Sequence, residues 1–488
     1  MSELSETADD LPSEPRRARD VTHFARETDV LVVGLGIAGA CASIEANAAG
    51  AEVLTLERAG GGGGTSANSG GLVYLGGGTP VQLAAGFEDS PEEMFRFLVA
   101  VSQPGANEDK IRLLCEQSVE HFHWLEACGV PFKRSFHPEP GMESPTDDGL
   151  VYSAGEDRAP YCDLVRPAPR GHQPQVPGKG GPFLMQRMLE AVAATDCVVE
   201  TNARVRTLVI EDDGEVVGAV VRSAGEEYCV RARRGVVLAA GGFVLNDAMC
   251  ARHAPELARC KVRSATEGDD GAGIRMGQGA GGETIHMDLG EVALPYTIPH
   301  RLARGIYVNA SGQRFINEDT YYGHVGVQGL FRQGGQVYLL LDDATYERGL
   351  VGLEPTWVGE TVAEVEREAG LPAGALVATV DFYNRHAAEG SDPVFHKRSD
   401  CLVPLSHPPF ALVDCRVEHA LWSCFTVGGL DTNCDGAVLT PDGRLVPGLY
   451  AAGRTAAIFS GHAYPGSGTS LADGSFFGRR AGRAAAAR

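Results

Sequence analysis

The first strongly patterned segment of the chain alternates between apolar runs and a glycine-rich turn. Residues 29–34 (DVLVVG) have the composition of a buried strand that ends in a turn. Residues 37–50 follow a helical pattern that ends at Gly50, and residues 51–57 form a second apolar strand that ends on Glu57. This order predicts the strand–helix–strand unit of an α/β, Rossmann-like fold.

The turn itself carries the spacing GxGxxG, at Gly34, Gly36 and Gly39. The first glycine permits the tight turn, the second lets the backbone approach a pyrophosphate, and the third lets the helix pack closely on the sheet. Glu57 lies at the distance along the chain that suits an acceptor for ribose hydroxyls. The unit therefore predicts a dinucleotide site, although the motif alone does not separate FAD from NAD.

A second pattern, much later in the chain, combines one strand with two helices. Residues 336–343 (QVYLLLDD) are strand-like, and residues 360–370 and 378–389 have helical spacing. A chain of 488 residues is too long for one compact core, so we expect two or three domains.

The composition of the chain excludes several classes of binding partner. The formal charge of −22 disfavours nucleic acid and anionic membrane surfaces, and no apolar stretch approaches the roughly 18 residues of a membrane helix. The polar N-terminus resembles no signal peptide, so we expect a disordered tail over residues 1–26 and a cytoplasmic location. The 12 cysteines form no CxxC pair, which indicates reduced thiols and no metal site.

Several later motifs point to one family. They are GGGGTSANSGG within 60–71, RGVVLAAGGFVLN (234–246), EGDDGAGIRMGQGAGGE (267–283), GQRFINED (312–319), PGLYAAGR (447–454) and SLADGSFFGRRAG (470–482). With these motifs the chain resembles the FAD-dependent fumarate reductase and 3-ketosteroid dehydrogenase family over nearly its whole length after residue 27. The resemblance implies a Rossmann-like FAD-binding domain (27–283 and 424–488) with an inserted α+β catalytic domain (284–423) that caps the flavin.

The resemblance also implies which residues hold the cofactor. Ser66 and the backbone of Ser69–Gly71 would lie near the pyrophosphate and flavin, and Val205 would touch the adenine. Ser470 and Leu471 would begin a helix that faces the flavin pyrimidine edge, where negative charge develops on reduction. The full predicted set is Gly34, Gly36, Ala38, Gly39, Glu57, Arg58, Ser66, Ser69, Gly70, Gly71, Val205, Ala240, Gly241, Asn246, Gly453, Ser470 and Leu471.

Two positions depart from the family pattern. Arg454 follows GLYAAG where relatives often have an acid, and Gly64 stands where relatives with covalently attached flavin have a histidine. We therefore expect FAD to be bound non-covalently.

The residues expected to contact the substrate differ from those of fumarate reductases, which bind the two carboxylates of their substrate with arginines and histidines. Tyr322 and Phe425 stand where that pattern has an arginine and a histidine, and the loop 462–470 contains no arginine. A dicarboxylate would be poorly solvated there, whereas tyrosines, a serine and apolar neighbours suit an uncharged ketone. Segments 74–80, 317–323 and 470–482 are most similar to Δ4-(5α)-type 3-ketosteroid dehydrogenases, while YPGSG (464–468) resembles the Δ1 type, so the regiochemistry stays open.

The resemblance implies a dehydrogenase that introduces a C=C bond beside the ketone of a 3-ketosteroid-like substrate. Tyr464 O–H and Gly468 N–H would hold the carbonyl oxygen, and a hydride would pass to flavin N5. Tyr322 or Ser467 would take the α-proton, with Tyr321 as a further candidate. The ordinary tyrosine pKa of about 10 favours Tyr322 over a serine hydroxyl. Alternatives are a flavin-dependent reductase of another unsaturated ketone or acid, and a non-catalytic electron-transfer component; the electron acceptor is unknown.

Overall fold

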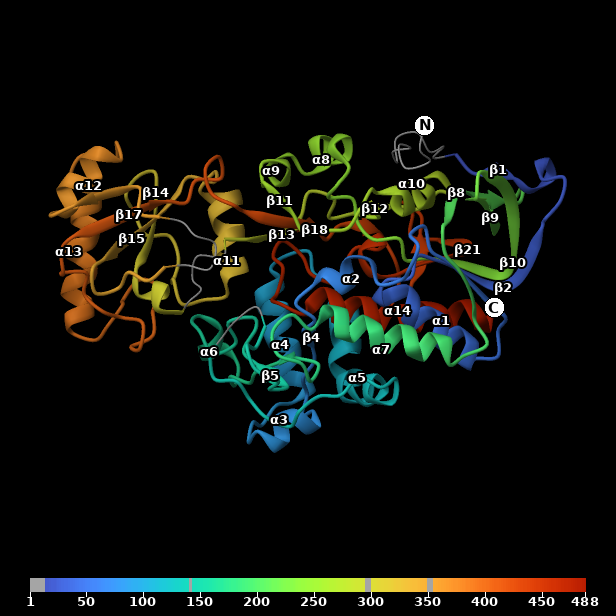
Figure 1. The fold of residues 1–488 in the computed structure, drawn as a ribbon, viewed down its shortest axis with the longest axis horizontal. Coiled ribbons are helices and arrows are strands. Elements are labelled where there is room, and N and C mark those ends of the chain that lie inside the picture. The colour runs from blue at the N-terminus through green and yellow to red at the C-terminus, as the bar shows by residue number, and fades with distance from the viewer. Residues whose placement is uncertain (1–13, 140–142, 295–299, 349–353) are drawn as a thin grey trace.

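The computed structural model describes residues 14–139, 143–294, 300–348 and 354–488. A large sheet lies at one end of an elongated molecule and a smaller α+β unit at the other (Figure 1). Between them run the first long helix and the last helix, side by side. The α/β fold class and the inserted α+β unit are confirmed.

The large sheet has nine strands and is formed by both ends of the chain. In spatial order its main path is β1 (Arg16–Arg17), β8 (Ala203–Ile210), β9 (Val216–Ser223), β10 (Glu226–Leu238), β2 (Arg26–Val33), β3 (Val53–Leu56) and β7 (Val198–Glu200). The C-terminal strand β21 (Leu445–Ala451) pairs parallel with β10 and antiparallel with β20 (Ala437–Leu439). The central strands are continuous apolar runs because both of their faces are buried in apolar clusters.

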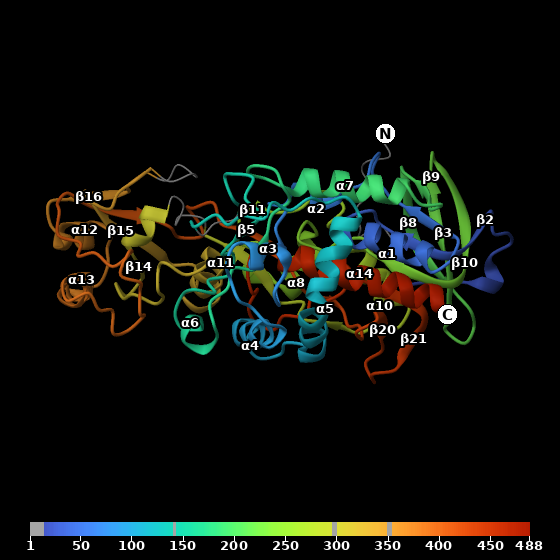
Figure 2. The ribbon, with the colours of Figure 1, turned by 90° about the horizontal axis from the view of Figure 1, so that it is seen from below.

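The last helix, α14 (Thr469–Ala487), packs against α1 (Ile37–Ala48) almost backbone to backbone. A Cβ atom at Gly478 would lie 2.5 Å from the Ala38 carbonyl oxygen, and one at Gly482 would lie 2.1 Å from that of Ala42. No side chain larger than hydrogen fits there without moving a helix. This contact sets both helices with their N-termini toward the same cavity. Helices α4 (Pro91–Ser102), α5 (Glu108–Ala127) and α7 (Gly181–Ala193) lie around the pair (Figure 2).

The smaller unit contains a four-stranded sheet in the order β14 (Ile306–Asn309), β15 (Val337–Asp342), β17 (Phe410–Asp414) and β16 (Trp357–Gly359). Its helices are α12 (Val362–Glu368) and α13 (Ala375–Ala388). The strand predicted over 336–343 is β15, and both predicted helices are present. Apolar side chains of α12 and α13 pack on one face of this sheet and form its core.

A third, three-stranded sheet connects the two units. Strand β18 (Ser423–Thr426) pairs with β13 (Gly290–Ala293) on one side and with β11 (Val262–Arg263) on the other. Because β18 spans the predicted boundary between residues 423 and 424, the division into domains at these residues stays a prediction.

Part of the segment predicted to be a disordered tail is ordered. Within it, Arg16–Arg17 form β1 beside β8, and Ala18, Val21 and Phe24 pack on an apolar cluster of the large sheet. Arg16 also forms an ion pair of 2.8 Å with Glu227. The apolar contacts explain why this polar-looking segment is ordered from residue 14; residues 1–13 lie outside the described part. None of the described helices is both long and apolar enough to cross a membrane.

Candidate active site

A cavity of about 1180 Å³ extends from the N-terminus of α1 to the surface of the smaller unit. The glycine-rich loop 61–71, the end of β10, residues 263–270, β13 and the loop before α14 line it. This volume exceeds that of ordinary small-ligand sites and suits a dinucleotide together with a substrate.

The GxGxxG turn shapes one end of the cavity as predicted. Gly34 has φ +97°, and a Cβ there would lie 2.5 Å from the Ala239 carbonyl oxygen. The carboxylate of Glu57 accepts hydrogen bonds from the amides of Leu35 and Ala59, each 2.8 Å long, so it is fixed at the cavity wall. Its oxygens retain lone pairs with which they can accept ribose hydroxyls.

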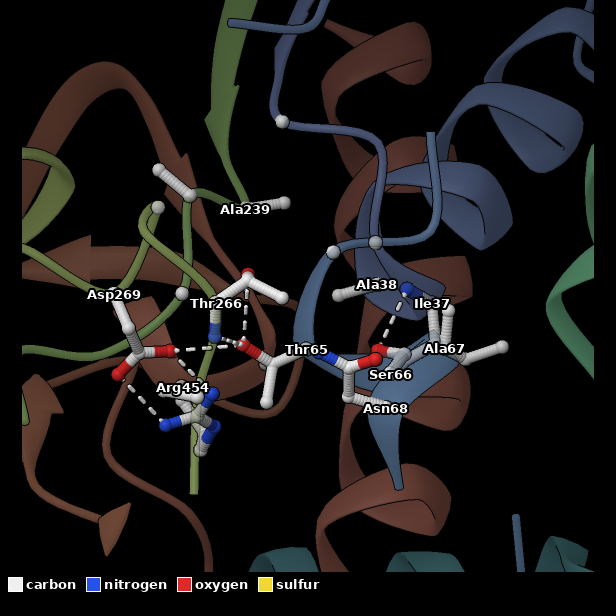
Figure 3. Close-up of a pocket in the computed structure, with 18 of the residues that line it drawn as sticks. Ile37, Ala38, Thr65, Ser66, Ala67, Asn68, Ala239, Thr266, Asp269 and Arg454 are labelled. Carbon is white, nitrogen blue, oxygen red and sulfur yellow. Dashed lines mark hydrogen bonds and ion pairs between the residues drawn. The ribbon is translucent and has the colours of Figure 1, made fainter. Parts of the chain in front are cut away.

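An ion pair that sequence reasoning missed lies beside the glycine-rich loop (Figure 3). The Arg454 guanidinium holds both oxygens of Asp269, with Nη1–Oδ1 at 2.9 Å. The Thr65 hydroxyl donates to the same carboxylate at 3.3 Å and accepts the Thr266 amide at 3.1 Å. Asp269 thus supplies the carboxylate that is missing after GLYAAG. The motif 267–283 contains it, but only the fold brings it to Arg454.

The N-terminus of α14 also faces the cavity. The Thr469 amide donates to the Gly466 carbonyl, and the Ser470 amide donates to the Tyr464 hydroxyl at 2.9 Å. The Leu471 amide has no partner within the described part of the chain, so it is available to a ligand. The Ser470 Oγ is buried and has no hydrogen-bond partner among the described residues. A buried hydroxyl without a partner, at a helix N-terminus, can form a hydrogen bond with a polar ligand such as the flavin pyrimidine edge.

All but two of the residues predicted to hold the cofactor line the cavity. Gly39 lies beneath the turn, where a Cβ would meet the Gly34 carbonyl oxygen at 1.9 Å, so it serves helix packing. Asn246 does not line the cavity. Its side chain caps α8 (Asp247–His253) through the Met249 amide and donates to the Asp270 carbonyl oxygen.

The predicted substrate residues meet at the other end. Tyr321 and Tyr322 lie at the start of α11 (Tyr322–Val327), while Tyr464, Ser467 and Gly468 come from the loop before α14. The Tyr322 hydroxyl lies 2.7 Å from Ser467 Oγ, and the Ser467 hydroxyl donates to the Tyr321 oxygen at 3.3 Å. The Gly468 amide has no partner among the described residues. Because Tyr464 accepts the Ser470 amide, its own proton is free to be donated into the cavity.

Contacts between the two units hold the tyrosines in place. Asn317 donates to the Ala159 carbonyl oxygen at 3.0 Å, and Arg158 Nε donates to that of Asp319 at 2.9 Å. Between these residues Glu318 is fully buried and paired with Arg314 at 2.7 Å. The NED motif is therefore a structural anchor for the tyrosines that follow it.

Burial changes the acid–base chemistry of this end. It raises the pKa of Tyr464 to about 12, and it raises the pKa values of Tyr321 and Tyr322 further above the ordinary tyrosine value. The ordinary tyrosine pKa is thus no argument for Tyr322 as a base. Sequence reasoning also missed Glu291, a buried glutamate of β13 that lines the cavity beside these tyrosines. It stands in no motif, and only its place on an otherwise apolar strand could have drawn attention to it.

The family can be identified from the whole chain. The model of the FAD binding domain family matches residues 29–471, which is most of the chain. The chain belongs to this family. It is an FAD-dependent oxidoreductase, and the cavity described above has the shape and the donors that its cofactor requires.

Relatives of two kinds resemble the chain. The probable fumarate reductase Ifc3 of Shewanella frigidimarina is 30% identical over 94% of this chain and 75% of its own length. The 3-oxo-5-alpha-steroid 4-dehydrogenase of Comamonas testosteroni is 28% identical over 89% of this chain and 94% of its own. A solved structure of 3-ketosteroid-delta4-(5alpha)-dehydrogenase from Rhodococcus jostii RHA1 in complex with 4-androstene-3,17-dione is 49% identical, has a TM-score of 0.92, and is matched over 97% of this chain and 99% of that one.

The lining of the cavity predicts non-covalent attachment of FAD. Among the described residues that line it there is no histidine or cysteine, and Gly64 stands at the position of the histidine in covalently flavinylated relatives. Acid precipitation of the purified yellow protein should therefore release the flavin into the supernatant, as absorbance near 450 nm would show. Flavin colour that stays in the washed pellet would contradict this prediction.

Proposed function

We propose that this enzyme oxidises a 3-ketosteroid-like substrate and introduces a C=C bond beside the ketone, with Δ4-(5α) regiochemistry favoured. The observation that carries the proposal is the pair of free donors, Tyr464 O–H and Gly468 N–H, beside a cluster of uncharged hydroxyls. Donors of this kind stabilise the enolate oxygen that forms when an α-proton leaves. FAD, when bound, supplies the acceptor for the β-hydride.

The residues divide the reaction between them. Tyr464 and Gly468 polarise the carbonyl and fix its position, while the Tyr322–Ser467–Tyr321 cluster takes the α-proton. Burial of the tyrosines keeps water from competing for that proton. The cofactor would be held by the GxGxxG turn, Glu57, the Asp269–Arg454 pair and the N-terminus of α14. The unit 284–423 would then close over the bound ketone.

A dicarboxylate substrate is disfavoured by charge. Cations must face such a substrate, yet Arg454, which packs over the Phe425 ring, is already paired with Asp269. Tyr322 and Phe425 occupy two positions where the fumarate reductase pattern has cationic or ionisable side chains. The similarity to the Rhodococcus jostii enzyme, 49% identical, supports the steroid over the dicarboxylate.

The first test is anaerobic mixing of the oxidised enzyme with saturated 3-ketosteroids, followed by flavin absorbance. We expect rapid bleaching, and product analysis should show a new Δ4 double bond. A Δ1 product would support the alternative that the YPGSG loop suggests. The chemically reduced enzyme should not be reoxidised by fumarate; reoxidation at a rate comparable to ketosteroid turnover would contradict the substrate assignment.

The second test separates the roles of two tyrosines. Tyr464→Phe removes a carbonyl donor and should lower the rate of flavin reduction by ~100- to 1000-fold. Tyr322→Phe interrupts proton removal and should lower it by ~100- to 10,000-fold. A phenolic ligand that mimics the enolate should bind weakly to Tyr464→Phe and nearly normally to Tyr322→Phe. Both variants keep the ring, so flavin absorbance is the control for folding. Wild-type reduction by Tyr322→Phe would show that the proton leaves by another route.

A further inference from the structure

Glu291 is one of the residues that line the substrate end of the cavity. It belongs to β13 and pairs with Phe425 of β18 in the antiparallel register. Helix α11 packs directly on this strand, since a Cβ at Gly326 would lie 2.0 Å from the Val292 carbonyl oxygen. Glu291 is 4% exposed and lines the cavity together with Tyr321.

No cation compensates this carboxyl group. Among the described residues no lysine, arginine or histidine forms an ion pair with Glu291, whereas other buried carboxylates such as Glu318 are paired. The titratable groups that face it are Tyr321 and Tyr322, Tyr464 from the last loop, and Cys424 of β18. Burial raises the pKa of Glu291 to about 8, and its interaction with Tyr321 opposes this shift. Burial of an unpaired carboxyl group lowers the stability of a fold. Its presence in the cavity therefore indicates a functional role.

The hydrogen bonds of the neighbouring hydroxyls run in one direction. Ser467 has a single hydroxyl proton, which it donates to the Tyr321 oxygen at 3.3 Å. The 2.7 Å contact between Ser467 and Tyr322 therefore has Tyr322 as the donor. The proton of Tyr321 is then left for an acceptor, and Glu291, which lines the cavity with Tyr321 and interacts with it electrostatically, is the carboxyl group available there.

We infer that Glu291 is the final acceptor of the substrate α-proton, which reaches it through Tyr322, Ser467 and Tyr321. The inference rests on the proposed function. The α C–H bond breaks and its electron pair forms the enolate held by Tyr464 and Gly468. The proton enters at the Tyr322 oxygen while each hydroxyl passes its own proton to the next. All three hydroxyls end neutral, and the Glu291 carboxylate becomes a carboxylic acid.

This arrangement resolves the difficulty with a tyrosine base. Burial raises the pKa values of Tyr321 and Tyr322, so neither forms a phenolate near neutral pH. In a concerted relay no phenolate has to accumulate, because the charge ends on a carboxyl group. Glu291 must start ionised, so the rate should rise with pH and level off above its pKa of about 8. Glu291 acts through Tyr321 and needs no contact with substrate.

The test is the pH dependence of flavin reduction at saturating 3-ketosteroid, measured anaerobically by stopped flow. The wild-type rate should rise about tenfold per pH unit and level off above pH about 8. Glu291→Gln should lower the plateau by ~100-fold or more and remove the inflection. Glu291→Asp should keep an inflection. Glu143→Gln, at another cavity-lining glutamate whose charged neighbour is Lys179, should match wild type.

Two controls separate the outcomes. Glu291→Gln should keep the flavin spectrum and the affinity for the phenolic ligand, since it is nearly isosteric. Its Tm relative to wild type should rise with pH, because the raised pKa of Glu291 means that wild type loses stability as pH rises through about 8.

A wild-type rate and inflection in Glu291→Gln would overturn the inference, as would an inflection that persists at a lower rate. Failure of every ketosteroid to bleach the wild-type flavin would instead overturn the proposed function, while the Tm comparison would still report whether Glu291 ionises in this range.

Discussion

The site depends on the close contact between α1 and α14, the first long helix and the last. Glycines of α14 let its backbone reach that of α1, where no larger residue fits. Through this contact the GxGxxG turn and the loop 464–468 open into one cavity although they are more than 400 residues apart in sequence. Two helix N-termini then face the same ligand space, which suits a cofactor with a pyrophosphate at one end and a charge-accumulating ring at the other.

The distribution of charge completes the site. Arg454 is neutralised by Asp269 and Glu318 by Arg314, so these charges hold loops together and leave little net field on the substrate. What faces the substrate is a set of neutral donors and hydroxyls. Glu291 is the exception: it lines the cavity with Tyr321 and has no ion pair with a cation among the described residues. A ketone that must lose a proton and a hydride fits this arrangement better than a dicarboxylate does.

Local spacing was enough to predict the dinucleotide unit. The turn at Gly34–Gly39 and the acid at Glu57 belong to one strand–helix–strand segment, whose geometry depends on near neighbours in the sequence. The tyrosines and the last loop could be assigned only by family resemblance, because their meeting depends on packing between the two units. The Asp269–Arg454 pair joins segments 185 residues apart, and no spacing rule predicts it.

Other expectations failed because the same residue types also serve a purely structural role. Asn246 follows the AAGG segment, but an asparagine before a helix is also a good cap, and here it caps α8. Residues 14–26 look polar, yet their few apolar side chains find a cluster on the sheet. The degree of burial cannot be read from the sequence. It raises the pKa values of the tyrosines, and this is why we infer that Glu291 is the final proton acceptor.

The central claim is that a ketone is held by the last loop with its α-carbon at the hydroxyl cluster. A crystal structure of the FAD-loaded enzyme with a bound 3-ketosteroid tests this most directly. We predict the 3-keto oxygen within about 3 Å of both Tyr464 Oη and the Gly468 amide nitrogen, and the α-carbon next to Tyr322 or Ser467. A steroid whose carbonyl oxygen contacts neither donor, or that lies outside the cavity, would contradict the account.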